Sequence, residues 1–413
     1  MAADRIEVID AADAVAADTD PGSQALPELA EPGELQQTIN NYLASIESMQ
    51  AEHGVYHDRI GEELISLGLA YRSLGKYNEA IDAFNRSLHI NRINQGLHNE
   101  NMLSILELII ETNTRFSDWE ALDKNYSYLY WVNQRILGEF NTELLPVIDR
   151  LGRWHLNAYE LGSDPIPFKH LLIAEDLFND AVKIIETNYG EYDLRQINAL
   201  YGIAMTNYKI AIHATTSLDF SEVRTSTRSV GRLEAMLEEQ DARQELISDG
   251  YRGGKESIQR IIEIYEHNPE LPTDAHAIAL IHLGDWYMLF NRRITAAETY
   301  AQANAKLLAG GMQQKDIDLL FNKPRSLPAL SLPIEYDESR QTGAEANYVI
   351  ARFDVSKSGR AVNIEILEAH PAENVYLMRR AKNTIRSARF RPRIENGQPV
   401  ASAGVNVKYV FQD

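Results

Sequence analysis

The sequence predicts an α+β multidomain protein, in which an all-α solenoid of paired helices is followed by a small β-β-α-β domain. A helix-pair pattern that begins at Leu64 returns at Leu280, and internal repetition of this kind is typical of solenoids. Apolar alternation with a period of two residues, which indicates strands, appears in residues 342–413. The same segment is basic, whereas the rest of the chain is acidic. Together these observations predict two structurally different parts.

The composition sets broad limits. A chain of 413 residues is too long for one ordinary core, so two or three domains are expected. The absence of cysteine excludes disulfides, thiolate metal sites and cysteine catalysis. The net charge of -20 argues against nucleic acid or an anionic membrane as the main partner, because both require clustered lysine and arginine.

The charge is distributed unevenly along the chain. Residues 1–35 hold nine acidic residues against one base, Arg5, together with three prolines and two glycines, so they are expected to form a disordered acidic leader. Residues 342–413 hold eleven bases and seven acids. This asymmetry indicates different surfaces for different partners and suggests contact between the two ends of the chain.

The helix pairs are the most informative repeat. In the first copy Gly68 is followed after 12 residues by Ala80 and then by Phe84, and in the second copy Gly284 is followed after 12 residues by Ala296. A small residue lets two antiparallel helices approach, and an aromatic residue fills the space beside them. The pattern resembles the tetratricopeptide repeat, and weaker copies lie between the two strong ones. The solenoid is predicted over residues 36–311.

The first helix of each pair is expected to line a concave groove. The candidate lining residues are Glu62, Ile65, Leu69 and Arg72 in the first strong copy, and Ile278, Ile281, Asp285 and Met288 in the second. The charged residues in these two sets do not identify a class of ligand. A helical array that serves only as a spacer, without a peptide-binding face, remains the alternative.

The chain after the solenoid changes character twice. Residues 312–341 contain three prolines and are expected to form an extended linker. The C-terminal domain, residues 342–413, is expected to contain two alternating strands joined by a turn at Gly359, then a helix, and a closing strand. The Asn396-Gly397 pair predicts a second tight turn before that last strand.

This C-terminal part resembles the C-terminal domain of the TonB family. The resemblance depends on the opening hairpin "VIARFDVSKSGRAVNIEIL", the "RFRP" step, the "NGQPV" turn and the final "VNVKYVF". It implies a periplasmic domain of Gram-negative bacteria that binds an extended segment of an outer-membrane transporter by adding a strand to its sheet edge. The implied edge is the strand from Ala403 to Phe411, with Ala403, Val405, Val407 and Tyr409 as the implied partner-binding residues. Arg389, Arg391 and Arg393 are expected to form a basic rim that attracts an acidic partner, and a rim that is merely solvated is the alternative.

The interpretation that the sequence favours is a periplasmic adaptor that binds proteins or extended peptide segments through the groove and the sheet edge. Energy transducers of the TonB family carry an N-terminal anchor and a proline-rich spacer, and a helical array occupies that place here. An accessory component of energy-coupled outer-membrane transport, with a transporter or a motor component as partner, is the alternative. Periplasmic location presumes that a signal peptide has been removed, and a cytoplasmic location is the second choice.

Signals of an enzyme are weak. "DGYRGGKES", from Asp249 to Ser257, is similar to a phosphate-binding loop, but an aspartate stands at the first glycine position and Glu256 follows the lysine. A turn between helices is expected there instead. His53 and His57 are spaced as metal ligands could be, without an evident third ligand. We therefore expect no catalytic residue, no cofactor and no metal, and an enzyme with a helical regulatory array is the least favoured alternative.

Overall fold

The computed structural model describes residues 5–8, 32–162, 166–216, 229–328, 347–372 and 374–410. The chain divides into two compact units. The N-terminal unit comprises residues 18–154, and the C-terminal unit comprises residues 1–17 together with residues 155–413. No helix in the described part of the chain combines the length and apolar character needed to cross a lipid bilayer.

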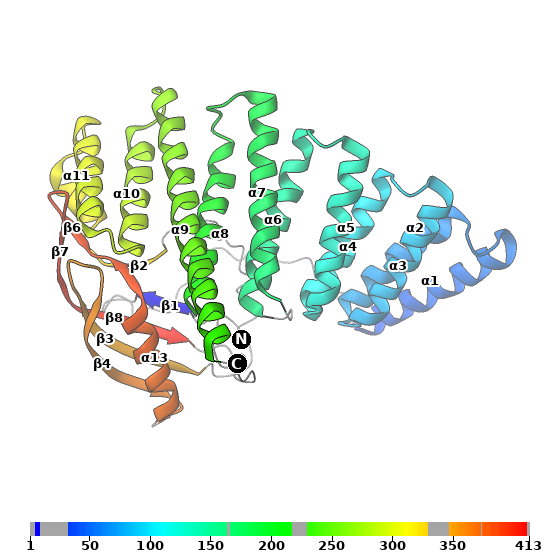
Figure 1. Ribbon diagram of the computed structural model, residues 1–413. Helices are drawn as coiled ribbons and strands as arrows, with labels where there is room; N and C mark the ends of the chain where they lie inside the picture. Colours follow the sequence, from blue (N-terminus) through cyan, green and yellow to red (C-terminus); the bar gives the residue numbers. More distant parts are fainter. Residues whose placement is uncertain are drawn as a thin grey trace. The chain divides into compact units, whose positions relative to one another are not determined.

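The N-terminal unit is built from helices joined by short turns (Figure 1). Their bounds are α1 (Pro32–His53), α2 (Asp58–Ser73), α3 (Tyr77–Gln95), α4 (Glu100–Phe116), α5 (Trp119–Leu137), the 3-10 turn η2 (Thr142–Leu144) and α6 (Leu145–Leu161), within which the unit ends. The first helix starts at Pro32, before the predicted start at residue 36, and proline is favoured at the first position because its missing N–H needs no partner there. Asn99 and Asp118 cap α4 and α5 by accepting hydrogen bonds from the N–H groups of Met102 and Ala121.

The C-terminal unit continues with helices and ends in the C-terminal domain (Figure 1). The helices are α7 (Phe168–Tyr189), α8 (Gln196–Thr216), α9 (Ser229–His267), α10 (Thr273–Leu289), α11 (Arg293–Ala309) and α12 (Gln314–Leu320). In Figure 1, α7 to α11 stand side by side as a row. This all-α architecture with a small sheet at its end confirms the predicted fold class.

The two strong repeats pack as their spacing predicts. The ring of Phe84 on α3 lies directly over Gly68 on α2, where an added Cβ would come within 2.4 Å of the ring. The ring of Tyr300 on α11 lies over Gly284 on α10 at the same 2.4 Å. Glycine is therefore required at both positions because the aromatic ring occupies the space that any side chain would fill.

Replacing Gly68 with alanine is expected to destabilise the N-terminal unit by about 1–3 kcal/mol, because the core must absorb a methyl group where the Phe84 ring lies. Urea unfolding followed by circular dichroism measures the change. Gly33→Ala in α1 is the matched control, since its added Cβ meets nothing within 4 Å, and alanine favours the helix. Equal unfolding midpoints for the two variants would contradict the packing described.

The glycine-rich stretch from Asp249 to Ser257 lies inside α9, so the expected turn between helices is wrong. Its glycines serve close helix packing. An added Cβ at Gly250 would lie 2.7 Å from the carbonyl oxygen of Asn207, and one at Gly254 would lie 2.2 Å from the Trp286 ring. These glycines lie where neighbouring helices approach α9. Close helix packing therefore accounts for the glycines that make the stretch similar to a phosphate-binding loop, and no ligand is needed to explain them.

The C-terminal domain contains a four-stranded antiparallel sheet of order β1-β8-β3-β4. Its strands are β1 (Arg5–Val8), β3 (Tyr348–Val355), β4 (Ala361–His370) and β8 (Ser402–Val410), and α13 (Val375–Ser387) follows β4. Two small sheets pair β2 (Arg325–Leu327) with β5 (Arg389–Arg391), and β6 (Arg393–Glu395) with β7 (Gln398–Val400). The predicted turn forms the β6–β7 hairpin, where Asn396 and Gly397 have φ of 50° and 74°, as a type I′ turn requires.

One face of the main sheet carries α13 and holds the core of the domain. Alternate residues of β3 and β8 are buried on this face with three residues of the helix, Leu377, Ala381 and Ile385. The buried strand residues are Val349, Ala351, Phe353, Val355, Val405, Val407 and Tyr409. The alternation of these strands in the sequence is therefore confirmed as a one-sided burial pattern.

The segments predicted to lack regular structure contain some. The predicted linker, residues 312–341, includes α12 and β2 in its described part, and residues 329–341 lie outside the described residues. The predicted leader, residues 1–35, supplies β1 and the start of α1, and its other residues lie outside the described part. The pairing of β1 with β8 confirms the contact between the two ends of the chain.

Candidate protein-binding surfaces

The strand predicted to be the open edge of the sheet is not an edge. The described part of that strand, β8, lies between β3 and β1, so the prediction is wrong for the folded chain. β3 pairs with β8 from Ser402 to Val410, whereas β1 pairs with it only from Val407 to Val410. The outer side of β8 is thus covered along part of its length by the chain's own N-terminal strand.

The predicted edge residues differ in exposure. Ala403 is exposed, and Val405, Val407 and Tyr409 point into the core against α13. Phe411, the last residue of the predicted strand, lies outside the described residues. The side chains of the three buried residues belong to the domain core, so these three residues can offer a partner only their backbone N–H and C=O groups.

The three arginines of the predicted basic rim have different surroundings. Arg391 is only 6% exposed and forms a two-point ion pair with Asp285, with Nε–Oδ1 and Nη2–Oδ2 distances of 2.8 and 2.5 Å. Arg389 is half-buried and donates to the carbonyl of Ser387, and Arg393 pairs with Glu395 at 3.0 Å. The rim interpretation is therefore wrong for Arg391.

Asp285 anchors a small buried network. It is 1% exposed, and its Oδ1 also accepts a hydrogen bond from the Tyr300 hydroxyl at 2.8 Å. Burial and the nearby carboxylate hold the pKa of Tyr300 well above its ordinary value. The Asp285 carboxylate thus accepts hydrogen bonds from Tyr300 on α11 and from Arg391 in the C-terminal domain. A buried charge with these partners is well satisfied.

The ion pair is part of a larger contact, which we call the seam: α10 and α11 against β2, β5 and the β6–β7 hairpin. Figure 1 shows the hairpin beside α11. Its apolar core contains Ile281, Met288, Ala296, Tyr300, Ala303, Leu327 and Ile394. At the hairpin tip, the N–H of Asn396 donates to Asp318, and an added Cβ at Gly397 would lie 3.1 Å from the Cα of Ala301.

The seam occupies the predicted groove of the last repeat. Of the four predicted lining residues on α10, Ile281, Asp285 and Met288 are buried, and Ile278 remains 47% exposed. The first three are therefore not available to a peptide, because the C-terminal domain already covers them. The predicted groove is wrong at this end of the solenoid.

The predicted groove residues of the N-terminal unit remain accessible. Glu62 on α2 is exposed, and Ile65, Leu69 and Arg72 are half-buried on the same helix. Arg72 pairs with Glu111 of α4 at 2.7 Å. This face thus combines the apolar side chains of Ile65 and Leu69 with the ion pair between Arg72 and Glu111.

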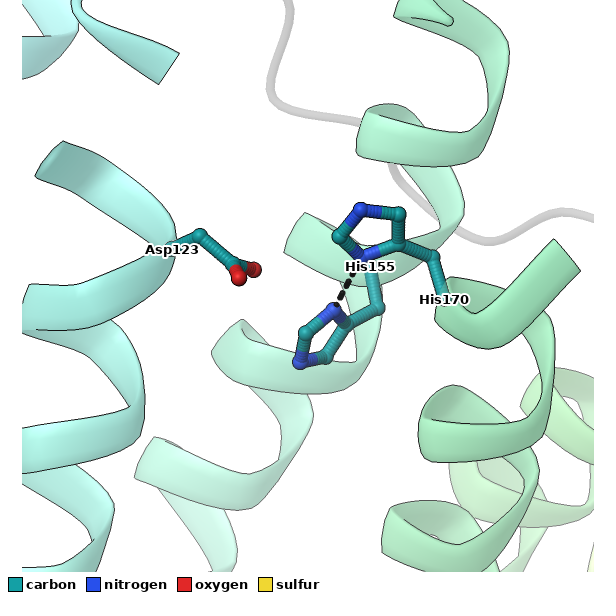
Figure 2. A group of neighbouring side chains, drawn as sticks. All are labelled: Asp123, His155 and His170. Atoms are coloured by element: carbon teal, nitrogen blue, oxygen red, sulfur yellow. Dashed lines mark hydrogen bonds between the residues drawn. The ribbon is translucent and has the colours of Figure 1, made fainter. Parts of the chain in front are cut away.

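Two histidine environments in the C-terminal unit are unusual. His282 on α10 is buried, bonds to the hydroxyl of Tyr201 at 2.7 Å, and has its pKa lowered to about 4, chiefly by burial. His155 and His170 are buried with their Nδ1 atoms 2.8 Å apart (Figure 2). That hydrogen bond requires one Nδ1 to carry a proton and the other to accept.

The rings of His53 and His57, the spaced pair noted in the sequence, stack with centroids 4.7 Å apart.

Two segments match known protein families. Residues 333–412 match the family described as Gram-negative bacterial TonB protein C-terminal, and residues 62–94 match the tetratricopeptide repeat. The chain carries a tetratricopeptide repeat and a TonB-like C-terminal domain. Both are families of protein–protein interaction modules. The TonB-like domain is therefore the part whose core, seam and partly covered edge are described above.

Solved structures with similar helices were also found. BtubC (BKLC) from P. vanneervenii is 13% identical with a TM-score of 0.35, and the match covers 70% of this chain and 92% of that one. A Podosopora anserina putative kinesin light chain with nearly identical TPR-like repeats is 11% identical with a TM-score of 0.38, covering 62% and 99%. At these identities the likeness concerns the fold alone. A search of curated proteins gives no significant match.

Sequence reasoning missed two features of these surfaces. The first is β1, a four-residue strand whose pattern is hidden among the acidic residues that follow it. The second is the pairing of Asp285 with Arg391. A signal for it exists on α10, because Asp285 is the one acid beyond the first turn of a helix that is apolar nearly all round, and such a helix is usually buried on all sides.

Proposed function

We propose that this protein is a protein–protein interaction adaptor of the Gram-negative cell envelope, located in the periplasm. The match of residues 333–412 to the TonB C-terminal family carries the proposal. Its partners are proteins or extended peptide segments, and an outer-membrane transporter or a motor component is the class that the family suggests. Nucleic acid is disfavoured as a partner by the net charge of -20.

The TonB-like domain binds its partner by strand addition to the outer side of β8, in the place that β1 partly occupies. Strand addition uses backbone hydrogen bonds and accepts many sequences. Two observations support this mode: the core-facing side chains of β8 leave its backbone as the contact, and Ala403 is exposed beside a stretch that β1 does not cover. Arg389 and Arg393 add attraction for an acidic segment.

The solenoid groove serves a second partner through the N-terminal unit alone. The accessible face of α2, with Glu62, Ile65, Leu69 and Arg72, fits a segment that combines an apolar side chain with a charged one. The corresponding face of α10 lies under the TonB-like domain, so the adaptor holds its two partners on different units.

A photo-crosslinking experiment tests the proposal. The photoreactive residue p-benzoylphenylalanine replaces Ala403 in the full-length protein expressed in a Gram-negative host, and Lys382 on the exposed face of α13 is the matched control position. We expect adducts with envelope proteins at position 403 and none at position 382. Adducts with cytoplasmic proteins only, equal adducts at both positions, or no adducts would overturn the proposal.

One observation favours the second candidate, an accessory component of energy-coupled transport. The seam joins the TonB-like domain to α10 and α11 through a buried ion pair and an apolar core, and a component that transmits force needs such a fixed connection. If this role is correct, the Arg391→Ala variant should fail to restore transporter-dependent growth to a strain that lacks the gene, while still producing adducts at position 403. Full restoration of growth would favour the adaptor role.

A further inference from the structure

The two sides of β8 are covered to different extents. On one side β3 pairs along the strand from Ser402 to Val410. On the other side β1 pairs Arg5 with Val410 and continues only to Val8 opposite Val407. Among the described residues, no other strand lies on this side, so the stretch from Ser402 to Asn406 has no partner strand there. The outer side of β8 is therefore half occupied and half open.

We propose that residues Arg5–Val8 are a resident strand, which an incoming extended segment displaces from β8. The incoming segment pairs first with the open stretch, Ser402–Asn406, and then replaces β1 residue by residue toward Val410. The N-terminal strand thereby controls access to the binding edge. This inference rests on the proposed strand addition, and it assigns to β1 a role that the family resemblance does not contain.

The energetics of the two strands favour such an exchange. A strand of four residues makes few backbone hydrogen bonds, and each contributes only about 0.5–1.5 kcal/mol net. An incoming segment that pairs along all nine residues of β8 makes more of them. β1 is nevertheless part of the same chain, so its pairing with β8 is intramolecular and has the advantage of a raised effective concentration. The resident strand therefore weakens the binding of short segments and yields to long ones.

Charge assists the resident strand. β1 belongs to the segment of residues 1–35, which holds nine acids against one base, whereas residues 342–413 hold eleven bases and seven acids. Opposite net charges attract over about 10 Å at moderate ionic strength and are screened by salt. The same bias that brings β1 to the TonB-like domain would also attract an acidic incoming segment, so the two compete for one surface.

The absence of cysteine permits a direct test of the resident strand. Glu7 lies opposite Lys408 in the register, and opposite residues have Cβ atoms about 4.5–5.5 Å apart, near the reach of a disulfide. The full-length variant Glu7→Cys/Lys408→Cys would carry the only two thiols of the chain. We expect mild oxidation to link them within one molecule at least about tenfold faster than in the control Glu7→Cys/Arg352→Cys, because Arg352 lies on β3, one strand further away.

The mass of the oxidised product decides between one chain and two. A linked monomer on a non-reducing gel supports the resident strand. A covalent dimer would show that β1 pairs with a second copy, and equal oxidation rates in the two variants would show that β1 has no fixed place. Either of these results overturns the inference.

A binding experiment tests the exchange itself. The probe is a fluorescent synthetic peptide with the sequence of residues 2–10, titrated into full-length protein. The variant Ile6→Pro/Glu7→Pro removes two successive N–H groups from β1, one of which must face β8. We expect it to bind the peptide at least about tenfold more tightly than the natural sequence does. The matched control, Ala11→Pro/Ala12→Pro, lies beyond β1 and should bind as the natural sequence does.

The oxidised Glu7→Cys/Lys408→Cys protein separates the two proposals. It should bind the peptide at least about tenfold more weakly than its reduced form. Equal binding by the oxidised and reduced forms would overturn the resident strand while leaving strand addition in place. If the disulfide forms as expected but position 403 yields no envelope adduct, strand addition to an envelope partner fails, while the pairing of β1 with β8 stands.

Discussion

Replacing Asp285 with alanine is expected to lower the free energy of unfolding of the C-terminal unit by about 3–5 kcal/mol. The reason is that the change leaves the Arg391 guanidinium buried without its counter-charge and takes an acceptor from the Tyr300 hydroxyl. Of the four tryptophans, only Trp286 falls in this unit. The fluorine resonance of 5-fluorotryptophan at this position, followed in urea, therefore measures the effect.

The matched controls separate the ion pair from general damage to the seam. Arg391→Ala should cost a similar amount, and the double variant Asp285→Ala/Arg391→Ala should cost clearly less than the sum, because no buried charge is then left unpaired. Arg393→Ala removes the accessible ion pair with Glu395, and should cost no more than about 1 kcal/mol. Strictly additive costs would show that the two side chains do not act on each other.

Acid is expected to destabilise the C-terminal unit through His282. Burial lowers the pKa of this side chain from 6.5 to about 4, so below pH 6.5 the unfolded chain takes up a proton that the folded one does not. The free energy of unfolding should therefore fall as the pH drops from about 6.5 to about 4, by roughly 3 kcal/mol from this group. Urea unfolding at a series of pH values, with the Trp286 resonance as readout, tests this.

The variant His282→Asn isolates the contribution. Asparagine offers the Tyr201 hydroxyl a hydrogen-bonding group at the place of Nδ1 and does not titrate. Burial also lowers the pKa of His276, which acts in the same direction in both proteins. The difference between the natural sequence and the variant should thus shrink as the pH falls from 6.5 to 4. A difference that is constant with pH would mean that the ring of His282 does not titrate abnormally.

Features that depend on nearby residues were predictable from the sequence. The step of 12 residues from Gly68 to Ala80 places a glycine under the Phe84 ring, because two antiparallel helices of fixed length bring these positions together. The Asn396-Gly397 turn follows from the φ values that a two-residue hairpin requires. In both cases the physical constraint acts within about one helix pair or one hairpin, and a sequence pattern contains it.

Features that join distant segments were not predictable in the same way. Asp285 and Arg391 are separated by 106 residues. The apolar surroundings of Asp285 on α10 indicate that it is buried, but nothing in the sequence identifies Arg391 as its partner. β1 joins β8 from the opposite end of the chain, and a backbone pairing of this kind accepts almost any alternating segment. The strand predicted to be the edge, β8, is therefore paired on both sides, and the strand that covers part of it was not foreseen.

The seam also covers the last repeat of the helical array. Repeat arrays need a terminal element that shields the apolar face of the last repeat from water, and here the TonB-like domain shields Ile281 and Met288 on α10. In exchange, the array shields Ile394 of the domain. A chain cut between α12 and β3 would expose both apolar faces to water and should precipitate. Neither fragment can therefore replace the intact protein in an experiment.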